Sequence, residues 1–180
     1  MKDLKTHLPN VILVKPIPAR DAKFAYEWFK SSYGKDTLLK MGNVEDEIRE
    51  PSLKAELARL EDFLKLEKEG KQITWVIRSE NSTIGAAWIN LYESNGVKAP
   101  SIHLMIGDHS YRGRGIGKAT MAAMVNYLQK TGEETVYSRH LVSNETVRAL
   151  NRSFGFILDG QPYLDNDKLE WQNIMLRLPK

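Results

Sequence analysis

Three glycines alternate with bulkier residues in the run Arg112, Gly113, Arg114, Gly115, Ile116, Gly117 and Lys118. Glycine permits positive φ angles and places no side chain in the way of a ligand, so the amide hydrogens of this run can converge on one point. An amphipathic helix pattern begins at about Gly115, and the first N–H groups of a helix lack internal partners and carry partial positive charge. The run therefore predicts an anion site, with a phosphate group as the expected occupant.

Two common phosphate-binding patterns do not fit this run. The G-x-G-x-x-G pattern of dinucleotide-binding folds, counted from Gly113, would need glycine where Lys118 stands. The P-loop pattern G-x-x-x-x-G-K-[ST] would need glycine at Arg112, and Ala119 takes the place of the residue that binds magnesium. A surface turn without a ligand, or an RGG-like nucleic-acid contact, remains as the alternative, although the strand-then-helix setting disfavours both.

A second informative segment runs from Asn144 to Phe156. Asn144 can cap a helix, Glu145 lies in its first turn, and Gly155 can end it. These are ordinary helix signals, and alone they say nothing about function.

Together the two segments resemble the GCN5-related N-acetyltransferase (GNAT) superfamily. Arg112, Gly115 and Gly117 match its signature [QR]-x-x-G-x-[GA], and residues 144–156 resemble its later motif N-x-x-[AS]-x-x-x-[YN]-x-x-x-G-F. The likeness is strong over residues 101–156. In the first half it is looser, and there residues 13–29 look similar to the branch of ribosomal-protein N-terminal and aminoglycoside 6'-type acetyltransferases.

The resemblance implies an α/β (α+β) fold. The expected sheet is mixed and mostly antiparallel, has a splayed central pair of parallel strands, and is covered by about four helices. It also implies acetyl-CoA as the acyl donor, with its pyrophosphate on the backbone from Arg112 to Lys118. The pantetheine arm would pair with the backbone of Met105, Ile106 and Gly107.

Two asparagines of the second motif complete the implied donor site. The resemblance places Asn144 against the pantetheine from the other side, although Asn144 can equally be a plain helix cap. Asn151 stands where many relatives carry a tyrosine that protonates the departing thiolate. Because an amide cannot serve as a general acid at pH 7, the acid is open between a water, Tyr163 and no protein acid.

The absence of cysteine excludes a cysteine acyl-enzyme and thiolate metal sites, and no metal is expected. Direct attack of a neutral amine on the thioester in a ternary complex is then the simplest route, with a backbone N–H near Ile106 polarising the carbonyl. His103 is the predicted general base, because its usual pKa of about 6.5 suits the task. It could equally be packed on the sheet, and Asp108 and His140 are weaker alternatives.

Some charged residues allow two interpretations of their role. Arg114, Lys118 and Arg148 could neutralise cofactor phosphates, while Arg148 could equally lie on a solvated helix face. The acidic helix from Glu56 to Glu69 could attract a polycationic acceptor, but a solvated face explains it at least as well.

Hydrophobic periodicity supplies the elements that must position these residues. Helices are predicted from Asp21, from the cap Ser52 to Gly70, over residues 115–130 and over residues 144–154. Strands are predicted over residues 10–15, 73–78, 84–91, 101–106, 135–142, 156–159 and 170–178.

The chain as a whole has 180 residues, 42% of them hydrophobic, and a formal net charge of +3. This predicts one domain over residues 1–180, in the cytoplasm, with no nucleic-acid or membrane partner. The predicted activity is acetyl transfer from acetyl-CoA to a primary amine, and the alternative is a non-catalytic acyl-CoA-binding module. Peptide N-termini, aminoglycosides, polyamines and small metabolites remain open as acceptors, as does a homodimer.

Overall fold

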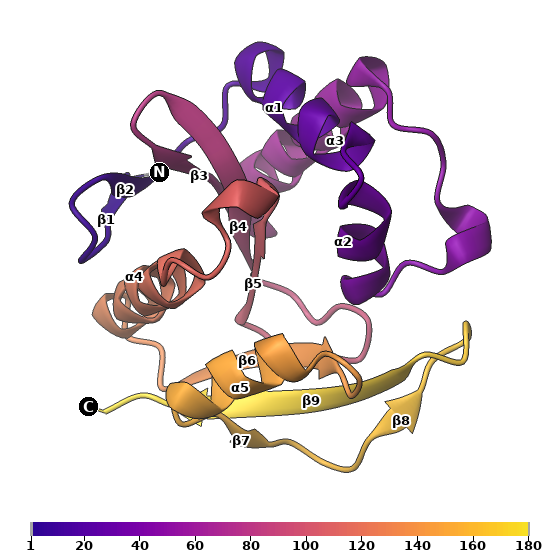
Figure 1. The fold of residues 1–180 in the computed structure, drawn as a ribbon. Coiled ribbons are helices and arrows are strands. Elements are labelled where there is room, and N and C mark those ends of the chain that lie inside the picture. The colour runs from indigo at the N-terminus through magenta and orange to yellow at the C-terminus, as the bar shows by residue number, and fades with distance from the viewer. Residues whose placement is uncertain (1, 180) are drawn as a thin grey trace.

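A nine-stranded sheet runs through the molecule (Figure 1), and the computed structural model describes residues 2–179 of the chain. Its order is β1-β2-β3-β4-β5-β6-β9-β7, with β8 also paired to β9. Neighbouring strands are antiparallel except for β5 and β6, which are parallel. The strands are β1 (Leu4–Lys5), β2 (Val11–Val14), β3 (Gln72–Ser79), β4 (Ser82–Asn90), β5 (Ser101–Ile106), β6 (Thr135–Leu141), β7 (Ile157–Leu158), β8 (Tyr163–Leu164) and β9 (Glu170–Arg177).

Helices lie on both faces of this sheet. They are α1 (Pro18–Lys30), α2 (Gly34–Lys40), α3 (Leu53–Lys68), α4 (Ile116–Lys130) and α5 (Glu145–Ser153), with short 3-10 turns at η1 (Glu45–Glu47) and η2 (His109–Tyr111). Successive residues of a strand point to opposite faces. On β5, Met105 faces α1 and α3, whereas Leu104 faces the start of α4 and α5. The mixed, mostly antiparallel architecture expected from the resemblance is confirmed.

Most predicted elements are present within a few residues, and the exceptions are short. Helix α1 begins at Pro18 rather than Asp21, because proline suits the first turn of a helix. Helix α2 was not predicted, since seven residues give too few turns for a periodic signal, so the structure has five helices rather than about four. The two-residue strands β1 and β8 were also missed.

The core lies mainly between the sheet and α4. Met121, Met124 and Leu128 of the predicted apolar face of α4 are buried, and they share a cluster with Trp75 and Ile77 of β3. No helix among residues 2–179 is both long and apolar enough to span a bilayer.

The sheet opens between β5 and β6. The two strands pair at a single ladder position, Ser101 with Tyr137, over the described residues. At that end the N–H of Tyr137 donates to Pro100 O (2.9 Å), and the hydroxyl of Ser138 donates to Ile102 O (2.9 Å). Beyond it the strands diverge, as Figure 1 shows, so the predicted splayed parallel pair is present.

Candidate active site

The glycine loop meets the first turn of α4 in a left-handed backbone conformation. Gly113 and Gly115 have φ of +73° and +76°, in the left-handed region that favours glycine. A Cβ atom built on either residue would meet nothing within 4 Å. The loop is therefore shaped for close approach from outside rather than for internal packing.

The amides of this loop are free of internal partners. The first internal bond of α4 runs from the N–H of Ala119 to Gly115 O (3.0 Å), and no side chain caps the helix. Within residues 2–179, the backbone N–H groups of residues 113–118 have no acceptor. Up to six donors at the positive end of a 15-residue helix fit a diphosphate.

Arg112 was predicted to belong to this donor set, but its backbone N–H and its guanidinium bond to other parts of the protein. Its N–H donates to His109 O (3.1 Å). Its guanidinium donates to Ile106 O from Nε (3.0 Å) and Nη2 (2.9 Å), and to the hydroxyl of Thr37 from Nη2 (2.7 Å). Arg112 thus joins the end of β5 to α2, and the amide donors begin at residue 113.

Replacing Arg112 by methionine should lower the free energy of unfolding by about 2 kcal/mol, because it leaves Ile106 O and the buried Thr37 hydroxyl without a charged donor. The matched variant is Arg114→Met, since Arg114 is exposed and its guanidinium lies over the Tyr111 ring (5.1 Å). It should leave stability unchanged and weaken coenzyme A binding. Urea unfolding of both variants checks this, and equal stability losses would contradict the bracing role of Arg112.

The register of β5 decides which backbone groups face the gap. Gly85 pairs with Ile106, and the N–H of Gly107 donates to Ile84 O (2.9 Å). In an antiparallel ladder, residues alternate between bonding to the neighbour and pointing away from it. The N–H and C=O groups of Leu104 and Ile106 therefore point away from β4 into the gap.

Three residues were predicted to contact pantetheine through their backbone. Of these, only Ile106 directs its backbone groups into the gap. Met105 lies in the bonded position opposite Ala86, and its side chain lines a pocket on the α1–α3 face. Gly107 donates to Ile84, and a Cβ there would lie 2.2 Å from the Trp28 ring. Leu104 was missed, because its position depends on register, which no local pattern encodes.

The two asparagines of the second motif have partners inside the protein. Asn144 caps α5 by accepting from the N–H of Val147 (3.2 Å), and its amide donates to Lys40 O (3.1 Å). Asn151 is 2% exposed and lies 3.3 Å from Nδ1 of His140. Both ends of the Asn144 amide, and the amide nitrogen of Asn151, are therefore bonded within the protein rather than free for a donor.

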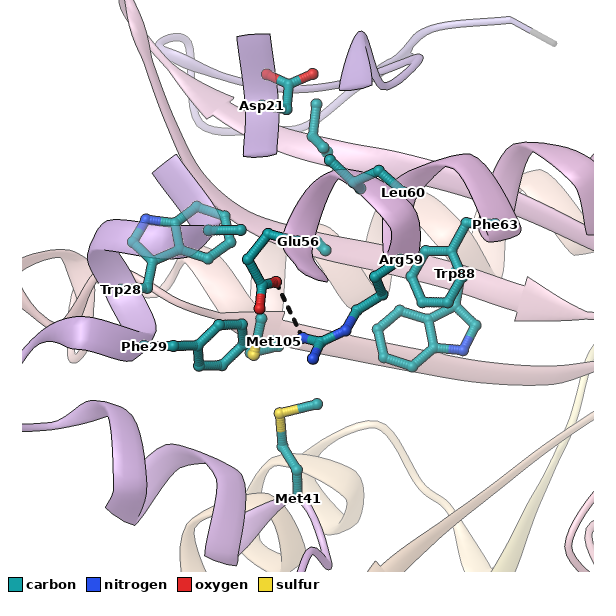
Figure 2. A pocket seen from close by; sticks show the side chains of 13 residues that line it. Asp21, Trp28, Phe29, Met41, Glu56, Arg59, Leu60, Phe63, Trp88 and Met105 are labelled. Atoms are coloured by element: carbon teal, nitrogen blue, oxygen red, sulfur yellow. Dashed lines mark ion pairs between the residues drawn. The ribbon is translucent and has the colours of Figure 1, made fainter. Parts of the chain in front are cut away.

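A small pocket opens on the α1–α3 face beside Met105. Figure 2 shows Glu56 and Arg59 of α3 pointing into it, with aromatic rings on both sides. It holds about 60 Å³ of space open to water. Its aromatic walls are Trp28, Phe29, Phe63 and Trp88.

Glu56 is a buried carboxylate in these apolar surroundings. It is 4% exposed, and its ion-pair partner is Arg59 at 3.1 Å. Burial raises the pKa of Glu56, and the positive charge of Arg59 offsets this in part. Of the two interpretations of the acidic helix, the solvated face is wrong for Glu56. The available signal was that Glu56 shares the i, i+4, i+7 spacing of Leu60 and Phe63.

Asp21 is the other carboxylate in this pocket, but its oxygens are already bonded. They accept from the N–H of Ile17 (2.7 Å), from Arg20 (2.8 and 3.0 Å) and from the hydroxyl of Thr83 (2.8 Å). Asp21 therefore anchors α1 to β4, and Glu56 is the carboxylate available to a ligand.

His103, the predicted base, borders the pocket through Trp88, on which its ring stacks at 5.3 Å. Its Nε2 lies 3.1 Å from the hydroxyl of Ser101 and 3.4 Å from the amide nitrogen of Asn90. Burial, and then the positive charge of Arg139, lower the pKa of His103 to about 4. The imidazole is therefore neutral at pH 7 and a weak proton acceptor.

The two weaker alternatives for the base also lie away from this pocket. Asp108 accepts from the N–H (2.9 Å) and hydroxyl (2.6 Å) of Ser110 and so caps η2. His140 is buried on the opposite face of the sheet, under α5. The part of the chain that the structure describes has no group of three or more potential metal ligands.

Comparisons with known proteins agree with this geometry. The family model described as acetyltransferase (GNAT) domain matches residues 11–157. None of the curated proteins compared with the sequence is a significant match.

Several solved structures have the same fold at low sequence identity. One is RimL, the ribosomal L7/L12 alpha-N-protein acetyltransferase, in complex with coenzyme A: TM-score 0.78, 15% identity, 98% of each chain covered. The microcin C7 self-immunity acetyltransferase MccE, with acetyl-CoA and AMP, has TM-score 0.76 and 15% identity, covering 94% of this chain and 93% of that one. Mycobacterium smegmatis RimJ has TM-score 0.76 and 14% identity, covering 98% and 87%.

Proposed function

Because the chain belongs to the acetyltransferase (GNAT) domain family, and so is an acetyl-CoA-dependent N-acetyltransferase, we propose that its acceptor is a primary amine that enters beside Glu56. The observation that carries this proposal is the arrangement of two openings around β5. The unpaired amides of α4 and the strand gap lie toward one face, and the Glu56 pocket lies on the other. A donor threaded through the gap would meet an acceptor at the end of β5.

The donor would be held almost entirely by main chain. The N–H groups of residues 113–118 would bind the pyrophosphate, and Arg114 and Lys118, both exposed beside the loop, would add positive charge. The backbone N–H and C=O of Leu104 would pair with the amide groups of the pantetheine arm, as a further strand would, while Ile106 O stays bonded to Arg112.

The acceptor would be held by charge and aromatic surface. An ammonium group suits a carboxylate flanked by aromatic rings, since both attract cations. Over residues 2–179, Arg59 is the one ion-pair partner of Glu56, and a carboxylate can accept several hydrogen bonds. We therefore assign to Glu56 the binding of the amine and the removal of its proton.

In the transfer itself, the amine nitrogen forms a bond to the acetyl carbon and the carbon–sulfur bond breaks. Glu56 takes the proton that the amine loses, and the N–H of Ile106 stabilises the developing negative charge on the carbonyl oxygen. The coenzyme A thiolate leaves into the gap. With Asn151 bonded to His140, water is the simplest source of any proton that the thiolate takes up.

His103 is assigned a supporting role, holding Trp88 and Asn90 at the edge of the pocket. His103→Asn should therefore lower kcat/KM by less than about tenfold, whereas loss of a general base costs roughly 10²- to 10⁴-fold. Steady-state kinetics at pH 7.5 checks this. A loss of kcat/KM above a hundredfold would indicate that His103 is the general base.

The proposed function is tested by measuring release of the coenzyme A thiol from acetyl-CoA with amines of each open class: peptides with free N-termini, polyamines, aminoglycosides and amino-acid amides. Acceptor-dependent release, with the acetylated amine identified by mass spectrometry, is the expected result. Donor binding without release for any amine would favour a non-catalytic acyl-CoA-binding module. The single domain, the cytoplasmic location and the homodimer remain predictions.

A further inference from the structure

A second cavity, of about 470 Å³, lies beside α5. Its walls come from α5, β6, β9 and the segment around β7. Cavities of this size commonly hold small organic molecules, since known ligand pockets range from about 300 to 1,000 Å³. None of the residues assigned to the donor or the acceptor in the proposed function acts through this space.

Helix α5 separates this cavity from the strand gap. Leu150, on one side of α5, lies close to Leu104 of β5 and to the start of α4 at Gly117. Arg148, Asn151 and Arg152, which are three and four residues apart, line the cavity instead. A molecule in the cavity would thus lie on the far side of α5 from the donor.

Buried polar atoms in this cavity lack partners. The amide nitrogen of Asn151 donates to Nδ1 of His140 (3.3 Å), and Oδ1 of the same buried side chain has no hydrogen-bond partner among residues 2–179. Nε of Arg148 is likewise buried and unpartnered there. Such groups cost free energy unless a ligand or water bonds to them.

The cavity also favours an anion. Arg148 and Arg152 supply two guanidinium groups, and no carboxylate is among the lining residues. Glu145, an acid in the first turn of α5, pairs with Nη1 of Arg148 (3.1 Å) and is itself exposed. Burial, and then these two arginines, lower the pKa of His140, which leaves its imidazole neutral at pH 7 and able to donate from Nε2.

Apart from Gln172, whose amide nitrogen donates to Gly160 O (3.0 Å) and Asn173 O (2.7 Å), the remaining walls are apolar and partly open to solvent. They are formed by Val142, Phe156, Ile157, Leu158, Pro162 and Ile174. Ile157 and Leu158 are 55% and 67% exposed, so an apolar group lying against them would remove hydrophobic surface from water.

We propose that this cavity is a binding site for a small 2-hydroxy carboxylate with a branched apolar tail. The carboxylate would bond to Arg148 and Arg152, and the hydroxyl would donate to Oδ1 of Asn151. The tail would pack on Ile157 and Leu158. Such a ligand contains no amine, so the enzyme cannot acetylate it as an acceptor.

Isothermal titration with 2-hydroxy-4-methylpentanoate tests the site, in the presence of saturating coenzyme A. Binding should survive coenzyme A and should weaken at least about tenfold for 4-methylpentanoate, which lacks the donor to Asn151, and for 2-hydroxy-4-methylpentanamide, which lacks the charge. Competition with coenzyme A would place the ligand in the strand gap and overturn the proposal, as would absence of binding.

Two variants assign the contacts. Arg148→Met should abolish binding, and Asn151→Leu should remove the preference for the hydroxy acid over 4-methylpentanoate. Arg177→Met, an exposed arginine at the end of β9, is the matched control and should bind as the parent does. Unchanged coenzyme A affinity and thermal unfolding show that each variant is folded, and normal ligand binding by folded Arg148→Met would refute the site.

A second copy of the chain is the competing occupant, because β7 presents exposed apolar side chains at the sheet edge. Sedimentation equilibrium with and without Leu158→Asp distinguishes the two. A monomer that binds the hydroxy acid is the expected result. A dimer that Leu158→Asp dissociates, and that binds no hydroxy acid, would overturn the proposal.

Discussion

Replacing Gly115 by glutamate should weaken coenzyme A binding by more than about a hundredfold and leave the chain folded. The new side chain would project from a position where a Cβ meets nothing within 4 Å, into the space assigned to the pyrophosphate. Its negative charge would lie at the positive end of α4. There it would take the place of the pyrophosphate and repel the phosphate charges. Isothermal titration with coenzyme A measures the loss.

Gly70→Glu is the matched control for this variant. Gly70 has φ of +69°, close to the +76° of Gly115, and a Cβ there also meets nothing within 4 Å. Both variants therefore carry the same conformational cost, of order 1 kcal/mol, and the same added charge. Gly70→Glu should bind coenzyme A normally. Comparable coenzyme A affinities for the two variants would show that the pyrophosphate does not bind at the α4 loop.

The second large effect is expected for Glu56→Gln. The amide keeps the shape of the carboxylate but cannot accept a proton, so kcat/KM for the amine should fall by roughly 10²- to 10⁴-fold. The affinity for coenzyme A should not change, because Glu56 lies on the opposite face of β5 from the α4 loop. Glu61→Gln, an exposed acid of the same helix, is the control and should retain full activity.

The pH dependence of the reaction follows from the direction of the Glu56 pKa. Burial raises this pKa, and only the deprotonated carboxylate can take a proton from the amine. The value of kcat/KM should therefore fall as pH decreases through the raised pKa of Glu56. The acidic limb should disappear in Glu56→Gln. An unchanged limb in that variant would assign the titration to another group.

The sequence predicted the elements on the donor side of the site well, because their signals are local. Left-handed glycines before a helix, and an asparagine three residues before the N–H that it caps, are encoded by neighbours in the chain. Gly113, Gly115 and Asn144 therefore lie in the elements where they were expected. Apart from the two-residue strand β8, the order of strands and helices from residue 72 onward was predicted for the same reason.

The acceptor side was predicted poorly, because it is assembled from distant segments. Glu56 is buried only because α3 lies over Met105 and Trp88, contacts that no periodic pattern specifies. The same holds for His103, whose low pKa comes from its packing beneath its neighbours and from Arg139 of another strand. A histidine on an alternating strand gave no indication of this environment.

Arg112 shows how a motif can be matched while the role of one of its side chains stays unpredicted. The signature places an arginine before the glycines, and the resemblance implied only a contact between its backbone and the pyrophosphate. In the structure its guanidinium instead bonds to Ile106 O and Thr37. Helix α2, which supplies Thr37, was not predicted, so the partner that decides the role of Arg112 was missing from the sequence argument.

The one ladder position that joins β5 to β6 also has a consequence for the lifetime of the protein. The sheet therefore consists of two halves, β1–β5 and β6–β9. The boundary between them lacks main-chain hydrogen bonds over most of its length, and such regions open more readily than continuous sheet. In the proposed function, a bound acyl donor bridges the two halves of the sheet across this boundary. At a hundred times its dissociation constant, a ligand adds about 2.7 kcal/mol to folding stability. The abundance of the enzyme would then follow the supply of its own substrate, because proteases would reach the empty form first.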